Sequence, residues 1–359
     1  MKKKSGFARC MVVGFLVLLA FTGGCGSPAA TGDEETSSSS GTTISLNLGH
    51  FFPATHPVET EFVQKWIEAI DEATEGAVKI ESYPGETLVN ASETYESVVS
   101  GIADIGLSCF SYTRGRFPVL EAFELPGITY YNSKSASKVA WEGIKELNPD
   151  EIQDTKLLMV FATGPGDLFT RVPVHNLDDL RNLEIRATGL SAQTLQALGA
   201  TPVGMSQPET YEALSRGIVE GNLAPVEVLQ GWRHAEVTDY ITQTPFLYNT
   251  LFFVTMNLDK WNSLPPEIQS TIEEVSEQIH ESIAKGLWDL QNQSALHWAV
   301  EETGQEIITL SETETERWIE RVMPLQDDFI KKMEEKGLPG ADIMERVNTL
   351  ADQYNETYH

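Results

Sequence analysis

The feature that most constrains the fold is an alternation of strand-like and helix-like segments that begins at Ile44. Helical stretches carry apolar residues every three or four positions, whereas strand-like stretches are short and apolar or alternating. Such alternation is typical of α/β proteins with a largely parallel sheet. The strand-like segments are residues 44–49, 77–83, 103–109, 157–162, 183–188, 218–223 and 251–256.

The alternation stops at the turn Gly164-Pro165-Gly166 and then restarts. About 315 residues remain from Ile44 onward, which is more than one hydrophobic core usually spans. We therefore expect two lobes. The helical pattern at residues 268–290 is longer than one lobe requires. A single helix of about 30 residues would run roughly 40 Å and could therefore span both lobes.

These patterns predict the following organisation of the folded part of the chain. The first lobe takes residues 44–163 and 252–291, and the second takes residues 164–251 and 292–325. Residues 326–359 are expected to form C-terminal helices that pack on the lobes.

The amino terminus has the features of a targeting signal. Basic residues precede an apolar run at residues 11–21, and small residues lead to Cys25. The run is shorter than the roughly 20 apolar residues of a transmembrane helix. We therefore expect residues 1–24 to be a signal peptide and Cys25 to carry a lipid anchor. Thr22 fits a lipidation motif poorly, so a plain secretory signal is the alternative.

Residues 25–43 are rich in Ser, Gly, Thr and acidic residues. This composition predicts a flexible, lipid-anchored linker. The protein is then expected in the periplasm or at the outer face of the cytoplasmic membrane.

The chain is strongly acidic, with 53 acidic and 25 basic residues and a formal net charge of −28. Nucleic acid is therefore disfavoured as a partner, because phosphate binding needs a basic face. Of the three cysteines, Cys10 lies in the predicted signal peptide and Cys25 is the predicted anchor. Cys109 is left in an apolar segment, where a buried free thiol is expected.

The sequence contains no constellation that is typical of an enzyme. No histidine pair has the helical spacing of zinc ligands, and Gly164-Pro165-Gly166 lacks the third glycine of a dinucleotide loop. No nucleophile elbow, phosphate-binding loop or Cys-x-x-Cys motif is found. We predict no enzymatic activity, no cofactor and no metal, with an extracytoplasmic enzyme as the less favoured hypothesis.

Several segments between residue 44 and about residue 269 resemble the dicarboxylate-receptor-like solute-binding proteins of tripartite ATP-independent periplasmic (TRAP) transporters, in the same order. Each segment alone is weakly specific, but together they are specific, and the resemblance fades in the C-terminal helices. The matching segments are residues 82–88, 101–105, 117–126, 177–186, 199–203, 209–221 and 261–267.

The resemblance implies a two-lobed periplasmic-binding-protein clamshell that closes on its ligand by a hinge motion. It also implies that the ligand is a small organic acid, which the protein delivers to integral-membrane TRAP permease subunits. We expect a monomer that contacts the membrane only through its anchor. A lipoprotein that serves an ABC permease or a sensor, for a carboxylate or another small metabolite, is the alternative.

The resemblance assigns the ligand carboxylate to Arg186. A guanidinium group can donate two parallel charge-assisted hydrogen bonds and stays charged when buried. Many relatives have a second ligand-contacting arginine, and this arginine is missing at the corresponding position of this chain, near Gly166. Where they have Asn, this chain has Ala224. Because a buried charge without a partner is costly, these departures favour an apolar or aromatic monocarboxylate over a dicarboxylate or a sugar acid.

Other candidates follow strand ends, where open α/β sheets bind ligands. Met205 stands at a position that is often aromatic in relatives, although ordinary core packing is equally compatible with it. Trp232 is interpreted as a packing residue rather than a cleft residue. The expected ligand-binding residues are Arg186, His50, Phe51, Tyr112, Thr163, Thr188, Met205, Ala224 and Glu227.

Overall fold

The structure is a computed structural model that describes residues 43–359. These residues belong to one compact unit, Thr42–His359. The predicted signal peptide, Cys25 and all of the predicted linker except its last residue lie outside the described residues. Within the described part of the chain, no helix combines the length and the apolar character needed to cross a membrane.

The first lobe is built on a five-stranded sheet. Strand β1 is parallel to β2 and β3, whereas β10 is antiparallel to β3 and β4. The strands in order are β2 (Val78–Tyr83), β1 (Ile44–His50), β3 (Ile105–Cys109), β10 (Leu251–Asn257) and β4 (Thr155–Ala162).

The second lobe is built on a six-stranded sheet. Strand β6 is parallel to β7 and β8, whereas β5 is antiparallel to β8 and β9. The strands in order are β11 (Glu306–Thr309), β9 (Tyr240–Gln243), β5 (Gly166–Thr170), β8 (Gly221–Pro225), β6 (Glu184–Ala187) and β7 (Thr201–Gly204).

The two-lobed α/β fold is confirmed, and each sheet is largely parallel, because only β10 in the first sheet and β5 in the second run against the other strands. The antiparallel strands β5 and β10 are the strands with which the chain enters a new lobe. Only residues 163–165 connect β4 to β5. Two adjacent parallel strands require a long crossover connection, usually a helix. The chain reaches β5 and β10 from the other lobe through connections that contain no helix.

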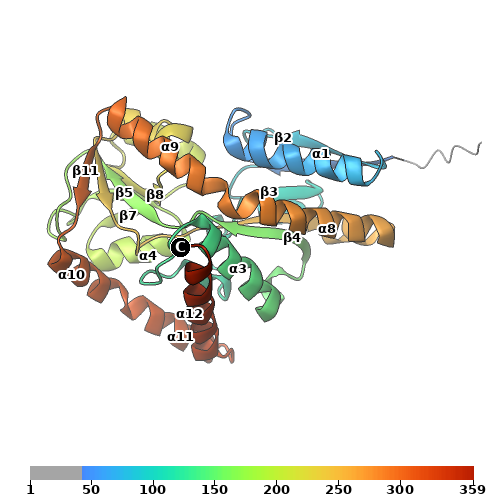
Figure 1. Ribbon diagram of the computed structural model, residues 1–359. Helices are drawn as coiled ribbons and strands as arrows, with labels where there is room; N and C mark the ends of the chain where they lie inside the picture. Colours follow the sequence, from blue (N-terminus) through green and yellow to red (C-terminus); the bar gives the residue numbers. More distant parts are fainter. Residues whose placement is uncertain (1–42) are drawn as a thin grey trace, which may run out of the picture. The chain divides into compact units, whose positions relative to one another are not determined.

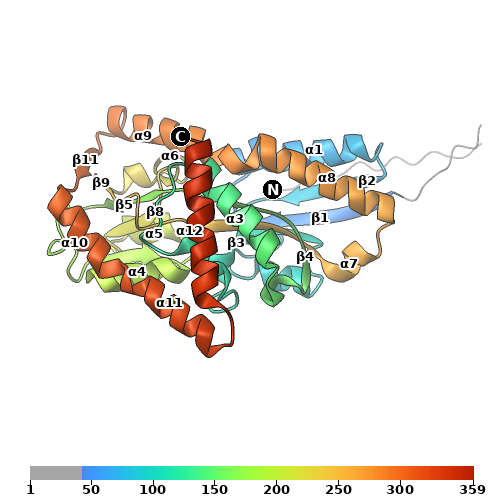
Figure 2. The same ribbon diagram turned by 60° about the horizontal axis from the view of Figure 1, so that its bottom comes forward.

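Helices cover both sheets, as Figures 1 and 2 show. In α1, Trp66 and Ile70 are four residues apart and fully buried, so they lie on one face of the helix. The first lobe has α1 (Gln64–Ala73), α2 (Thr94–Val99), α3 (Ser133–Leu147), α7 (Leu258–Asn262) and α8 (Pro266–Ser282). The second has α4 (Gly189–Leu198), α5 (Gln207–Ser215), α6 (Val228–Gly231), α9 (Leu287–Glu301) and α10 (Glu312–Val322).

The chain ends in α11 (Pro324–Glu335) and α12 (Gly340–Thr357). Helix α12 packs along α3 of the first lobe, as the dark red helix in Figure 2 shows. A π-helical turn, Val58–Val63, precedes α1. The 3-10 turns are Phe110–Tyr112, Leu120–Glu124, Asp150–Ile152, His234–Glu236 and Ala284–Gly286.

The predicted long helix does span both lobes, but it is broken into α8 and α9. Ile283 leaves the helical conformation, with φ −126° and ψ −63°. The amino terminus of α3 docks at the break, where the Ser133 amide donates to Asp289 Oδ1 at 2.7 Å and the Ser133 hydroxyl donates to the Lys285 carbonyl at 3.2 Å. Figure 1 shows the two helices following one another, α8 over the first lobe and α9 over the second.

Candidate functional site

A small cavity lies between the two lobes and is lined by side chains from both. Its volume is about 20 Å³, which is room for roughly one water molecule. Its walls include these expected ligand-binding residues: Phe51, Tyr112, Thr163, Arg186, Thr188 and Glu227. The free thiol of Cys109, predicted to be buried, lies in the same wall.

Arg186 brings a buried positive charge to this cavity. It lies on β6 and its residue is 2% exposed. Its Nε donates to the Met205 carbonyl at 3.1 Å, and its Nη1 donates to Asn222 Oδ1 at 3.4 Å. In the described part of the chain no carboxylate forms an ion pair with it. A buried guanidinium with neutral acceptors alone is poorly compensated, so an anion entering the cavity would supply the missing charge.

Neutral side chains orient Arg186 through a hydrogen-bonded network that begins at Asn222. Asn222 Nδ2 lies 3.2 Å from His234 Nδ1, and Gln207 Nε2 lies 3.0 Å from His234 Nε2. Burial, and secondarily the charge of Arg186, lowers the pKa of His234 from 6.5 to about 3. His234 is therefore uncharged at neutral pH, and this network orients the guanidinium without competing for its charge.

Aromatic rings form much of the remaining wall. The Phe51 ring centroid lies 5.5 Å from that of Tyr112, 6.1 Å from that of Trp232 and 6.3 Å from that of Phe252. Trp232 thus lines the cavity, which corrects its interpretation as a packing residue. Tyr112 also links the two lobes, because its hydroxyl accepts a hydrogen bond from the Gln207 backbone amide at 3.0 Å. Burial raises the pKa of Tyr112 well above its usual value, so the phenol stays neutral.

Glu227 contributes a second buried charge. It immediately precedes α6, is 3% exposed, and places its Oε2 3.2 Å from His56 Nε2. His56 follows β1 in the first lobe and was not among the expected ligand-binding residues. The only sequence signal was its place after a strand end, because its partner is 171 positions away.

Three expected residues do not line the cavity. His50 is fully buried and its Nε2 lies 2.8 Å from Glu59 Oε2. Ala224 is buried in the core of the second lobe. The Met205 side chain lines a neighbouring hollow instead, and only its carbonyl contacts Arg186.

Larger hollows are present at the surface. One of about 440 Å³ contains Arg114, Glu121 and Lys332 but not Arg186. Another, of about 540 Å³, shares Tyr112 and Thr188 with the cavity and therefore adjoins it. We regard the small cavity as the site, because a buried charge without a counter-ion and a wall of rings meet there, whereas neither of the two larger hollows contains Arg186.

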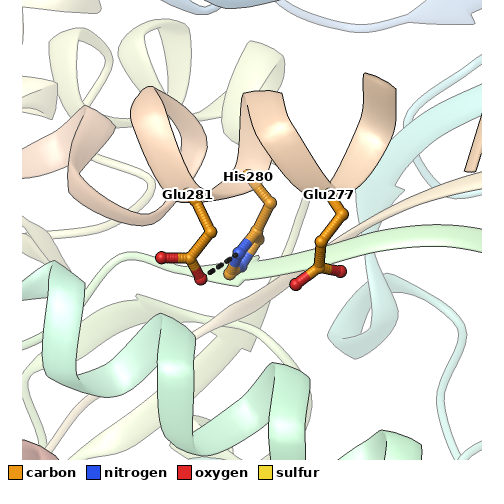
Figure 3. A group of neighbouring side chains, drawn as sticks. All are labelled: Glu277, His280 and Glu281. Carbon is orange, nitrogen blue, oxygen red and sulfur yellow. Dashed lines mark ion pairs between the residues drawn. The ribbon is translucent and has the colours of Figure 1, made fainter. Parts of the chain in front are cut away.

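Glu277, His280 and Glu281 project from one face of α8 and form a group whose ligand atoms lie within 4.8 Å of one another (Figure 3). The carboxylates already have partners. Lys138 Nζ lies 2.6 Å from Glu281 Oε1, and Trp141 Nε1 donates to Glu277 Oε2 at 2.8 Å. Burial, and secondarily the charge of Lys138, lowers the pKa of His280 to about 4. These contacts explain the two carboxylates as a polar link between α3 and α8, whereas both ring nitrogens of His280 are buried without a hydrogen-bond partner among the described residues.

Comparison with known proteins gives a match to a family model over residues 48–332; its description is bacterial extracellular solute-binding protein, family 7. A TRAP periplasmic solute-binding protein from Desulfovibrio salexigens DSM2638 is 34% identical. The two structures superpose with a TM-score of 0.75, covering 88% of this chain and 98% of the other.

Two further solved structures are similar. A marine metagenome TRAP solute-binding protein specific for aromatic acid ligands, in complex with meta-hydroxyphenylacetate, is 30% identical with a TM-score of 0.81 and covers 87% of this chain and 99% of its own. A TRAP periplasmic solute-binding protein from Bordetella bronchiseptica with bound mandelate is 28% identical, with a TM-score of 0.79. The match covers 86% of this chain and 99% of the other.

Proposed function

This chain belongs to family 7 of the bacterial extracellular solute-binding proteins, and from this membership we propose that it captures an aromatic monocarboxylate through Arg186. It is a periplasmic receptor of the TRAP type for small organic acids, as the sequence predicted. The observation that carries the finer proposal is a buried guanidinium without a counter-ion in a cavity with aromatic walls.

The charges of the cavity favour one carboxylate over two. Among the lining residues, all within the described part of the chain, Arg186 is the only basic side chain and Glu227 is acidic. One guanidinium can neutralise one carboxylate by a bidentate pair, and a second carboxylate would be repelled by Glu227. The rings around it offer offset and edge contacts to an aromatic ligand. The aromatic acids bound by two similar proteins support this choice.

We propose that the remaining parts of the transport role follow the family. The receptor would release its ligand, unchanged, to TRAP permease subunits in the membrane. Cys25 would anchor it after cleavage of residues 1–24. A Cys25→Ala variant is then expected to move from the membrane fraction to the soluble fraction on cell fractionation, and an unchanged distribution would contradict the anchor.

Ligand-dependent melting of the purified full chain tests the binding proposal. Benzoate and mandelate are expected to raise the melting temperature more than succinate or a sugar acid does, because they should bind more tightly to the cavity. A ligand at 100 times its Kd stabilises the folded state by about 2.7 kcal/mol. Arg186→Gln is expected to abolish the shift. Arg181→Gln is the matched control, since Arg181 is an exposed arginine paired with Asp178.

A melting temperature that does not respond to any acid would contradict the proposal. So would an Arg186→Gln variant that keeps the shift of the wild-type chain.

A further inference from the structure

Glu227 is a buried carboxylate whose hydrogen-bonding capacity is only partly used. Its Oε2 lies 3.2 Å from His56 Nε2, and no hydrogen bond to its Oε1 is found within residues 43–359. It lines the same cavity as Arg186 but forms no ion pair with it. An ionised carboxylate can accept several hydrogen bonds, and a buried one is costly to leave under-satisfied.

His56 bonds to Glu227 as a neutral donor. The Val58 backbone amide donates to His56 Nδ1 at 3.1 Å, so Nδ1 must be the unprotonated nitrogen. The single ring proton therefore lies on Nε2 and points to Glu227. Protonation of Nδ1 would bring two donors face to face. Glu227 is thus held by a hydrogen bond and not by a cation.

A second pair in the same protein shows what Glu227 lacks. His50 Nδ1 accepts the Phe52 amide at 3.2 Å, and His50 Nε2 lies 2.8 Å from Glu59 Oε2. Glu59 has further donors, because Gln64 Nε2 bonds to its Oε1 at 2.7 Å and Ser82 Oγ to its Oε2 at 3.0 Å. The same histidine–glutamate arrangement is complete away from the cavity and incomplete where the glutamate lines it.

Trp232 supplies a matching donor. Its indole ring lines the cavity, and its Nε1–H is buried without an acceptor among the described residues. A hydroxyl group both donates and accepts, so a ligand hydroxyl could donate to Glu227 and accept from Trp232. An aromatic amino group donates well but accepts poorly, because its lone pair is delocalised into the ring, and it would leave the indole N–H unpaired.

We propose that Glu227 and Trp232 select aromatic monocarboxylates that carry a hydroxyl group away from the carboxylate. This inference rests on the proposed function, because Arg186 must hold the carboxylate end. Glu227 is then a specificity-determining residue that distinguishes hydroxylated acids from unsubstituted ones.

Calorimetric titration of the full chain with benzoate, the three hydroxybenzoates and the corresponding aminobenzoates tests the inference. The best hydroxybenzoate is expected to bind roughly tenfold or more tightly than benzoate, since hydrogen bonds to charged groups are the stronger kind. Glu227→Gln and Trp232→Phe are each expected to reduce this ratio severalfold while benzoate still binds. Glu59→Gln is the matched control, because it makes the same change in the pair that does not line the cavity, and its ratio should equal that of the wild-type chain.

The outcomes separate the two proposals. Equal binding of benzoate and every hydroxybenzoate, a ratio unchanged in both variants, or a preference for an aminobenzoate would overturn the inference and leave the aromatic-acid receptor intact. If no aromatic acid binds a chain that melts normally, the proposed function fails and the inference fails with it. Should Glu227→Gln not fold, Trp232→Phe keeps the test valid, because it keeps an aromatic ring at this position and removes the N–H, together with part of the indole ring area.

Discussion

At the scale of residues, the buried carboxyl group of Glu124 makes the stability of the fold depend on pH. It ends the 3-10 turn Leu120–Glu124, and its Oε1 accepts the Leu251 amide of β10 at 2.7 Å. Burial raises the pKa of Glu124 from 4.5 to about 8. A raised pKa means that its contribution to stability is fully present below pH 4.5 and is lost as the pH rises through about 8.

Glu124→Gln is expected to remove this dependence, because the amide oxygen can keep the bond to Leu251 and cannot ionise. Relative to the variant, the wild-type chain should lose stability between pH 5 and pH 8.5, by on the order of a few kcal/mol. Urea unfolding of both chains across this range measures the difference. Parallel stability curves for the two chains would show that Glu124 does not titrate in this window.

The sequence could indicate the charged group of the site but not its complete wall. Arg186 was identifiable because a local motif surrounds it, and Phe51 and Tyr112 because they follow strands. Trp232 and His56 join the site through contacts between lobes, which no local pattern reports. His50 is the last residue of β1 and Phe51 follows it, but the His50 side chain turns to Glu59, and only the neighbouring elements decide that direction.

At the scale of elements, the amino terminus of α3 contacts the break between α8 and α9. The Asp289 carboxylate accepts the amide of Ser133, the first residue of α3. It thereby satisfies one of the amides that a helix leaves unpaired at its amino terminus, where negative charge is also favourable. Asp289→Ala is expected to lower the free energy of unfolding by about 1–2 kcal/mol.

Chemical denaturation of Asp289→Ala checks this prediction. Asp342, which lies in the first turn of α12, serves as a control for the loss of one acidic side chain. An Asp289→Ala variant no less stable than Asp342→Ala would show that the contact at the break is not stabilising.

The apolar pattern predicted one helix here because the pattern itself does not stop. Ile279, Ile283 and Leu287 keep a spacing of four residues through the break, so periodicity alone cannot detect it. The strands show the same limit. Each of the seven predicted segments overlaps a strand, whereas β5, β7, β9 and β11 were not predicted, because none of them contains more than two consecutive apolar residues.

At the scale of the whole molecule, the two lobes are held together around the cavity by direct hydrogen bonds. The bond from His56 to Glu227 and the bond from the Gln207 amide to Tyr112 each join one lobe to the other. A cavity of about 20 Å³ is too small for an aromatic ring. Ligand entry therefore requires the lobes or the lining rings to separate, as hinge closure in this kind of fold allows.

Gly231 allows one of these interlobe bonds to form. A Cβ at this position would lie 2.6 Å from Glu227 Oε2 and 2.8 Å from His56 Nε2, closer than such atoms can approach. Gly231→Ala should therefore separate His56 from Glu227 and favour an open arrangement of the lobes. Because the open chain must then close around its ligand, affinity for the ligand should fall by up to about tenfold.

Small-angle scattering of the unliganded chain is expected to give a larger radius of gyration for Gly231→Ala than for the wild type, and calorimetry a weaker affinity. Gly204→Ala is the control, since its added methyl group would meet its nearest atom, Arg114 Nη2, at an ordinary 3.4 Å. A radius and an affinity equal to those of the control would mean that the bond between His56 and Glu227 does not govern closure. Closure would then depend on the Tyr112 contact and on the rings of the cavity wall.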